Sequence, residues 1–184
     1  MKRAFITASA GLAALIAAGP AFAQQGSATG TVSVDGSVAN RCSLSISSQT
    51  ISVGEMSLAS NGKLDTSTVD GQNRTLVGFC NGSAATMTVE AQPLNNVTSP
   101  GAPPGGFDNR VDYTATANAN SVNATDTSTG AGPGSAVTVG QFNGNILVTL
   151  SASSSPTGGV LVAGTYQGQV LVTLAPLVAG PTEE

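Results

Sequence analysis

Residues 28–46 read ATGTVSVDGSVANRCSLSI and place an apolar or small residue at every second position except Asn40. In the first part of this stretch those residues are Ala28, Gly30, Val32, Val34, Gly36 and Val38. Cys42, Leu44 and Ile46 later resume the same phase. Successive side chains of a β-strand point to opposite faces, so the pattern predicts a strand with one apolar and one polar face. The apolar face has to be buried, either in the core of this chain or on another molecule.

Two interpretations of this stretch stay open. Asp35-Gly36 is flanked by alternating hydrophobic residues, which is a strong sequence signal for a two-residue β-hairpin. In that case residues 28–34 fold back on residues 37–46 as an ordinary sheet strand. In the other case the stretch stays unpaired within its own chain and is donated to a neighbouring molecule.

The first 23 residues have the features of a signal peptide. Lys2 and Arg3 give a positive start, an apolar segment covers residues 4–18, and Ala21-Phe22-Ala23 supplies a cleavage site of small residues before Gln24. The apolar segment is shorter than the ~20 residues that a spanning helix needs. We therefore expect export through a bacterial secretion pathway, with no membrane insertion after the signal peptide is removed.

Length and charge narrow the class of protein further. The 184-residue chain is long enough for one domain with a substantial core. Without residues 1–23, four basic residues remain against ten acidic ones. Nucleic acid is therefore not an expected partner, because phosphate binding needs clustered Lys and Arg. The few charges and the many Thr, Val, Gly and Ser residues favour closely packed strands over helices.

The chain contains two cysteines, Cys42 and Cys80. They do not form a C-x-x-C pair, so a redox-active site is disfavoured. An exported chain with a single pair is expected to form one structural disulfide. The loop-entropy relation assigns such a closure roughly 4 kcal/mol of stabilisation.

Several further segments have a strand pattern, and turn-rich segments separate them. Strands are expected at residues 75–80, 86–91, 111–117, 137–139, 146–150 and 166–174, and loops at residues 59–73, 93–106, 118–135 and 151–159, with a turn at Asn143-Gly144. About eight short strands with irregular spacing are typical of an all-β fold, an antiparallel β-sandwich of the immunoglobulin-like type. A membrane β-barrel is the competing interpretation, but the aromatic girdles that it requires are absent from the sequence.

The sequence offers little catalytic chemistry. It contains no histidine, which excludes Ser–His and Cys–His nucleophile systems. Lys63 lies in a polar loop, so a Ser–Lys dyad is improbable. Asp108 and Asp112 flank Arg110 and form a carboxylate pair suited to acid/base work or Ca²⁺, but their spacing matches no ligand loop. We expect no enzyme activity, no metal and no cofactor.

Three stretches together resemble a known family. They are ATGTVSVDGSVANRCSLSI at residues 28–46, TLVGFCNGSAATMTVEA at residues 75–91 and AGTYQGQVLVTLAP at residues 163–176. The chain is similar in these stretches to the spore-coat-protein-U-type pilin domain of archaic chaperone–usher pili. The cysteine placement and the terminal strand opened by Gly-Thr-Tyr carry most of the resemblance, whereas residues 93–159 match only in general character.

The resemblance implies an immunoglobulin-like sandwich that lacks one strand. A periplasmic chaperone lends a strand during folding, and the N-terminal strand of the next subunit replaces it in the fibre. Residues 24–38 would then be the donor strand, with Ala28, Gly30, Val32, Val34, Gly36 and Val38 as its partner-binding face, and residues 39–176 the domain. The Cys42–Cys80 disulfide would hold the first strand to its neighbour. The partners would be further copies of the chain, a chaperone and an usher, and the location a cell-surface fibre.

The sequence departs from that family at its end, where the tail LVAGPTEE at residues 177–184 follows the last strand. Two other functions are therefore considered. One is a monomeric surface or periplasmic β-sandwich that binds a glycan or a protein through residues 93–106 and 118–135. The other is a secreted hydrolase that uses Asp108 and Asp112.

Overall fold

The structure is a computed structural model that describes residues 26–176. The predicted signal peptide (residues 1–23) and the C-terminal tail (residues 177–184) lie outside the described residues. The chain forms two units with a boundary at Ser37, so that residues 26–37 belong to the first unit and residues 38–176 to the second. Within residues 26–176, no helix has the length and apolar character needed to cross a membrane.

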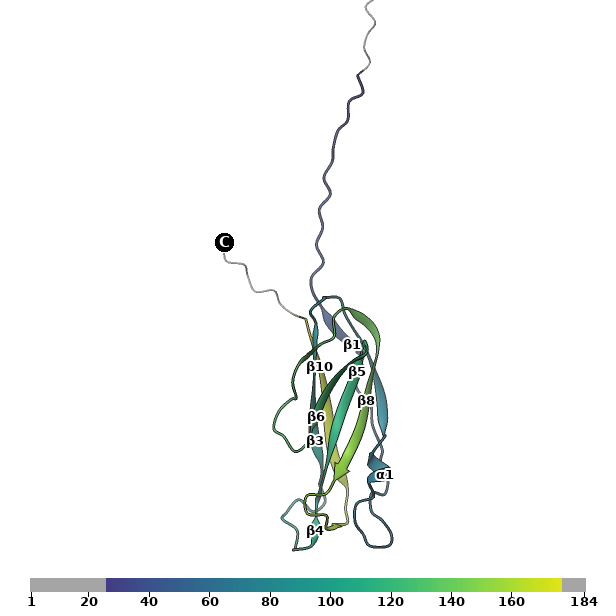
Figure 1. Cartoon of the computed structure of the whole chain (residues 1–184), viewed down its shortest axis with the longest axis vertical. Helices are drawn as coiled ribbons and strands as arrows, with labels where there is room; N and C mark the ends of the chain where they lie inside the picture. The colour runs from purple at the N-terminus through teal and green to yellow at the C-terminus, as the bar shows by residue number, and fades with distance from the viewer. Residues whose placement is uncertain (1–25, 177–184) are drawn as a thin grey trace, which may run out of the picture. The chain divides into compact units, whose positions relative to one another are not determined.

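The first unit contains no regular secondary structure in its described part. Residues 26–37 run as extended chain outside any strand, and all of their side chains are exposed (Figure 1). Residues 38–41 also belong to no strand. The hairpin that Asp35-Gly36 signals is therefore not formed, and the first strand of the described chain begins only at Cys42.

The second unit is all-β. Its strands are β1 (Cys42–Ile46), β2 (Asn73–Cys80), β3 (Thr86–Asn96), β4 (Phe107–Asp108), β5 (Arg110–Ala119), β6 (Val122–Thr127), β7 (Val137–Thr138), β8 (Phe142–Ser154), β9 (Val160–Leu161) and β10 (Tyr166–Ala175). Eight of them form one antiparallel sheet in the order β1-β2-β8-β5-β3-β10, with β6 on β5 and β7 on β3. Strands β4 and β9 form a separate parallel pair.

The sheet curls toward a barrel and stays open between its end strands β1 and β10. The prediction of an all-β, mainly antiparallel fold with one disulfide is thereby confirmed. The core lies inside the curl and is built from alternate residues of the three long strands β3, β5 and β8. These residues are Met87, Val89, Ala91, Ala115, Ala117, Ala119, Ile146, Val148 and Leu150.

Strand β3 is longer than the sequence pattern predicts. Residues 93–96 were expected to be loop but belong to β3, in spite of Pro93. The register between β3 and β10 shifts between Gln167 and Gln169, and this bulge accommodates the proline. A Cβ at Gly168 would lie 2.8 Å from the carbonyl oxygens of Gln92 and Pro93, so the bulge requires glycine opposite it.

Three other predictions of loops or turns are wrong. Residues 151–154, expected in a loop, belong to β8 and pair with β5. Residues 118–135 include β6, which forms a hairpin with β5 through Asn120 and Ser121, both at positive φ. The Asn143-Gly144 dipeptide forms no turn but lies inside β8, where Gly144 pairs with Gly78 of β2. In each case pairing with a neighbouring strand overrides the local preference for a loop or turn.

The segment 59–73, predicted as a polar loop, contains the short helix α1 (Thr66–Val69). Asp65 caps this helix, because its carboxylate accepts a hydrogen bond from the Ser67 amide at 3.1 Å. Val69 is fully buried beneath the helix. Val69 and the partly buried Leu64 thus anchor a segment whose composition is mainly polar.

Candidate functional site: the open seam between β1 and β10

The main feature of the domain is a gap in its sheet, which we call the seam. One side of the seam is β1 with the following residues 47–51, and the other side is β10. Among the described residues β1 pairs only with β2, and β10 pairs only with β3. Both strands therefore present a row of backbone N–H and C=O groups that no further strand of the described chain satisfies.

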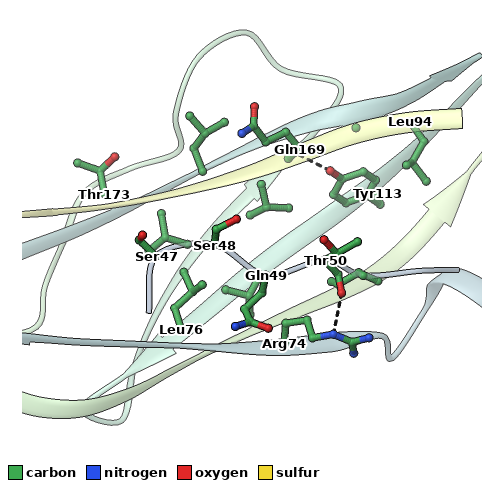
Figure 2. A pocket seen from close by; sticks show the side chains of 16 residues that line it. Ser47, Ser48, Gln49, Thr50, Arg74, Leu76, Leu94, Tyr113, Gln169 and Thr173 are labelled. Atoms are coloured by element: carbon green, nitrogen blue, oxygen red, sulfur yellow. Dashed lines mark hydrogen bonds between the residues drawn. The ribbon is translucent and has the colours of Figure 1, made fainter. Parts of the chain in front are cut away.

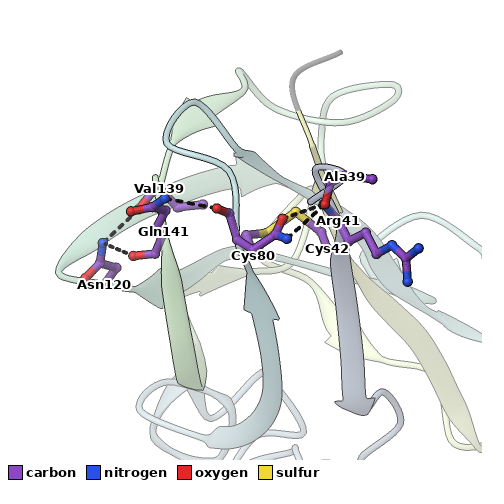
Figure 3. The surroundings of a disulfide bond; sticks show 8 residues. Ala39, Arg41, Cys42, Cys80, Asn120, Val139 and Gln141 are labelled. Carbon is purple, nitrogen blue, oxygen red and sulfur yellow. Dashed lines mark hydrogen bonds between the residues drawn. A yellow bond between two sulfur atoms is a disulfide. The ribbon is translucent and has the colours of Figure 1, made fainter. Parts of the chain in front are cut away.

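The seam is narrow at the end that contains the disulfide. Cys42 and Cys80 lie opposite each other on β1 and β2 and are covalently joined, as predicted (Figure 3). Close by, a Cβ at Gly78 would lie 2.7 Å from the Ser43 carbonyl oxygen, 2.9 Å from Leu44 Cδ2 and 3.3 Å from Leu174 Cδ1. Leu44 of β1 and Leu174 of β10 thus converge over this glycine.

The Asn81 side chain adds hydrogen bonds at the same end. Its carboxamide oxygen accepts from the Arg41 amide at 2.6 Å, and its Nδ2 donates to the Ala39 carbonyl at 2.9 Å (Figure 3). The residues that lead into β1 are therefore fixed to the turn after β2. These hydrogen bonds join the residues before Cys42 to the residue after Cys80, and so they support the disulfide in holding the start of the domain.

The seam widens toward the other end, because β1 stops early. Its register with β2 ends at Ile46 and Val77, and residues 47–51 then leave the edge of β2. Figure 2 shows Ser47, Ser48, Gln49 and Thr50 between β10 and β2. A single side-chain bond, from Arg74 Nε to the Thr50 carbonyl at 2.8 Å, ties this segment to β2.

The wide end of the seam forms a groove of about 610 Å³. Its apolar lining residues are Ile51, Leu76, Leu94, Val148, Val170, Leu171 and Val172. Most of these side chains are only half-buried, and Leu171 is 36% exposed. The groove thus combines apolar surface with two unpaired strand edges, which is the arrangement that β-strand addition uses.

Tyr113 of β5 also lines the groove. Its hydroxyl lies 2.6 Å from the Gln92 carbonyl oxygen and 3.1 Å from that of Gln169, so it links the floor of the groove to the bulge between β3 and β10 (Figure 2). Burial raises the pKa of Tyr113 to about 12, so its phenol stays a neutral hydrogen-bond donor at physiological pH. The alternation in residues 111–117 predicts the inward direction of this side chain but not its place beside the groove.

The residues predicted to form the donor strand make no strand in the structure. Ala28, Gly30, Val32, Val34 and Gly36 belong to the first unit, and Val38 follows directly in the second. Val34, for example, is 91% exposed. Their alternating apolar pattern therefore has no partner strand among residues 26–176.

The carboxylate pair Asp108 and Asp112 is divided between two different hydrogen-bond networks. Asp112 accepts from the Arg110 guanidinium at 2.6 Å and from Ser128 Oγ at 3.0 Å. Asp108 instead accepts from the backbone and side chain of Thr157 and from the Gly159 amide. Residues 26–176 contain no cluster of three or more side chains suited to a metal ion.

No protein-family model matches the chain, no curated protein matches it, and no solved structure matches it.

Proposed function

We propose that this chain is a non-enzymatic, exported subunit of a surface fibre, in which the N-terminal segment of one copy fills the seam of the next. In this proposal the domain is an immunoglobulin-like, pilin-type fold that lacks one strand. The observation that carries the proposal is the seam itself: two unpaired strand edges beside an apolar groove in a chain that also contains an unpaired, alternating segment.

The two parts match in length and periodicity. Side chains on one face of a strand recur about every 6.7 Å. Val170 and Val172 of β10 have this spacing, and Val32 and Val34 would have it once the segment is added as a strand. β10 offers a ten-residue edge, and the alternating segment from Gly30 to Val38 is of similar length. An added strand would satisfy backbone groups on β10 and cover the half-buried apolar side chains of the groove.

The glycines of the segment also have a place in this proposal. At the narrow end, Leu44 and Leu174 converge over Gly78 and leave little room for a side chain. Gly30 or Gly36 would let the donated backbone approach closely there. A subunit with an open seam would expose a strand edge before assembly. The resemblance to chaperone–usher pilins implies a periplasmic chaperone and an usher as the further partners.

The proposal is tested by adding the same charge to opposite faces of the donor segment. Val34→Lys places an ammonium on the face that enters the groove, and Ser33→Lys places one on the polar face. We expect Val34→Lys to lower the yield of polymer more than about tenfold, because a lysine side chain cannot be buried in an apolar groove without a partner. Ser33→Lys is the matched control and should polymerise like the parent chain.

Polymer is measured by size-exclusion chromatography and electron microscopy of the exported protein. Thermal unfolding of each variant checks that the domain is intact, since Val34 is exposed and its change should not affect stability. Equal polymerisation of the two variants would overturn the proposal. A full-length chain that stays a stable monomer without any chaperone would favour a monomeric adhesion module instead.

A further inference from the structure

A second hollow is lined by β4 and neighbouring loops. β4 lies at the end of the domain opposite β1 (Figure 1). The hollow has a volume of about 730 Å³ and is formed by Lys63 together with residues 103–110 and 156–160. Three segments that are far apart in the sequence therefore meet at this site. We call it the loop-end site.

Backbone pairing sets the arrangement of its side chains. Phe107 of β4 pairs with Val160 of β9, and Lys63 forms an antiparallel bridge with the same Val160. Residues opposite each other on neighbouring strands point to the same face. Lys63, Val160 and Phe107 thus form one row, in which the outer two backbone positions are about 10 Å apart, or two strand spacings.

Buried polar groups hold this backbone in place. Asp108 is only 4% exposed and accepts hydrogen bonds from the amides of Thr157 and Gly159, the latter at 2.8 Å. Its burial opposes ionisation, but the bonds from Gly159 and Thr157 outweigh this effect, so the pKa of the carboxyl is lowered. Asn96 is fully buried and binds the amides of Thr98 and Ser99.

Two side chains at the surface of the loop-end site, Phe107 and Lys63, are by contrast exposed. Phe107 is 43% exposed, although large aromatic residues are scarce in this chain. Lys63 is exposed and makes no ion pair among the described residues. Residues 26–176 contain four cationic side chains, and two of them, Lys63 and Arg110, line this hollow. Arg110 is paired with Asp112, so Lys63 is the cation of the hollow that is left for a ligand.

We propose that the loop-end site binds an acidic oligosaccharide. A sugar ring presents a C–H face that packs on the exposed ring of Phe107, and a carboxylate on the next sugar unit lies within reach of the Lys63 ammonium. The row from Lys63 to Phe107 is long enough for two linked sugar units. A hollow of this size, with an apolar platform beside several polar side chains, is suited to a small ligand and is too small for a standard protein interface.

This site does not depend on the seam, and its test does not require fibre assembly. The purified chain, in the assembly in which it is isolated, is titrated with a trimer of galacturonic acid by calorimetry. The same trimer with its carboxyl groups reduced to alcohols tests the role of charge. Tri-glutamate tests whether an acidic peptide is bound equally well.

Two variants remove the proposed contacts, and two serve as matched controls. Phe107→Ala and Lys63→Gln should each weaken binding of the acidic trimer by about tenfold or more. Phe79→Ala changes a phenylalanine of similar exposure on β2, and Arg41→Gln changes an exposed cation near the disulfide. Both controls should bind within about twofold of the parent chain.

The expected result is binding of the acidic trimer that is stronger than binding of the reduced trimer and of tri-glutamate. Equal affinity for the reduced trimer would overturn the role of Lys63, and equal affinity for tri-glutamate would overturn the role of Phe107. No binding of the acidic trimer up to about 10 mM would overturn the proposal as a whole.

Discussion

The seam and the loop-end site differ in how their backbone is satisfied. In the seam, β1 and β10 each lack a neighbour on one side, and residues 47–51 are tied to β2 by the single bond from Arg74. At the loop-end site, Asp108 and Asn96 bind the amides of the surrounding segments. The strand edges of the seam lack hydrogen-bond partners, whereas the backbone around the loop-end site is hydrogen-bonded to buried side chains.

This difference indicates what each surface can recognise. An unpaired strand edge is best completed by another strand, because only backbone groups repeat at the required spacing. A backbone that is already hydrogen-bonded leaves recognition to exposed side chains, here Phe107 and Lys63. The same domain thus offers a site for chain addition and a separate site for a small ligand.

The largest expected effect on stability concerns the narrow end of the seam. Replacing Cys42 and Cys80 together by serine removes a cross-link between residues 38 positions apart, which the loop-entropy relation values at about 4 kcal/mol. The free energy of unfolding, measured with urea, should fall by this amount, and the parent chain in reductant is the control. An unchanged midpoint would mean that hydrogen bonds such as those of Asn81 hold β1 in place without the disulfide.

A smaller effect is expected from closing the space between β1 and β10. In Gly78→Ala the new methyl group would lie 2.7 Å from the Ser43 carbonyl, so β1 has to shift. We expect a loss of about 3 kcal/mol, again measured by urea unfolding. Gly101→Ala is the control, because no atom lies within 4 Å of its added methyl group, and it should be neutral or slightly stabilising. Equal stability of the two variants would show that β1 is not packed closely against Gly78.

The smallest effect tests the loop-end site. The pKa of Asp108 is lower in the folded state than the value of about 3.9 in the unfolded chain. The ionised carboxylate therefore stabilises the fold fully when the pH is above the unfolded-state pKa. This contribution is lost as the pH falls through the folded-state pKa. At neutral pH we expect Asp108→Asn to cost about 1–2 kcal/mol. The difference in unfolding temperature between the parent chain and the variant should shrink as the pH falls from about 6 to about 2. This range brackets the unfolded-state pKa of about 3.9.

Asp35→Asn serves as the control for this prediction, since Asp35 is exposed in the N-terminal segment. It should leave the pH dependence of the unfolding temperature unchanged. A difference between the parent chain and Asp108→Asn that stays constant with pH would contradict the role assigned to the ionised carboxylate.

Much of the fold is predictable from local sequence patterns. Alternation over residues 86–91 and 166–174 correctly predicts the first half of β3 and nearly all of β10, and the single cysteine pair predicts the disulfide. The errors occur where a distant strand decides the conformation. Pro93 remains in β3 because Gly168 of β10 accommodates a bulge, and Asn143-Gly144 remains in β8 because it pairs with β2.

The candidate site was only partly predictable, for the same reason. Alternation identifies the N-terminal segment as a strand that needs a partner, but it does not decide between a hairpin and donation. Residues 47–51, Arg74 and Tyr113 carry no local sign of a groove. They become a site only because β1 and β10, at opposite ends of the sheet order, face each other when the sheet curls.

The sequence by itself determined the all-β class, the disulfide pair and the existence of an amphipathic N-terminal segment, because these depend on residue type and on a two-residue period. Tertiary structure alone decided that this segment is unpaired, that β1 ends before β2 does, and that Lys63 and Phe107 both pair with Val160. Each of these depends on pairing between residues far apart in the chain. Local periodicity contains no information about which strand edges are left without a neighbour.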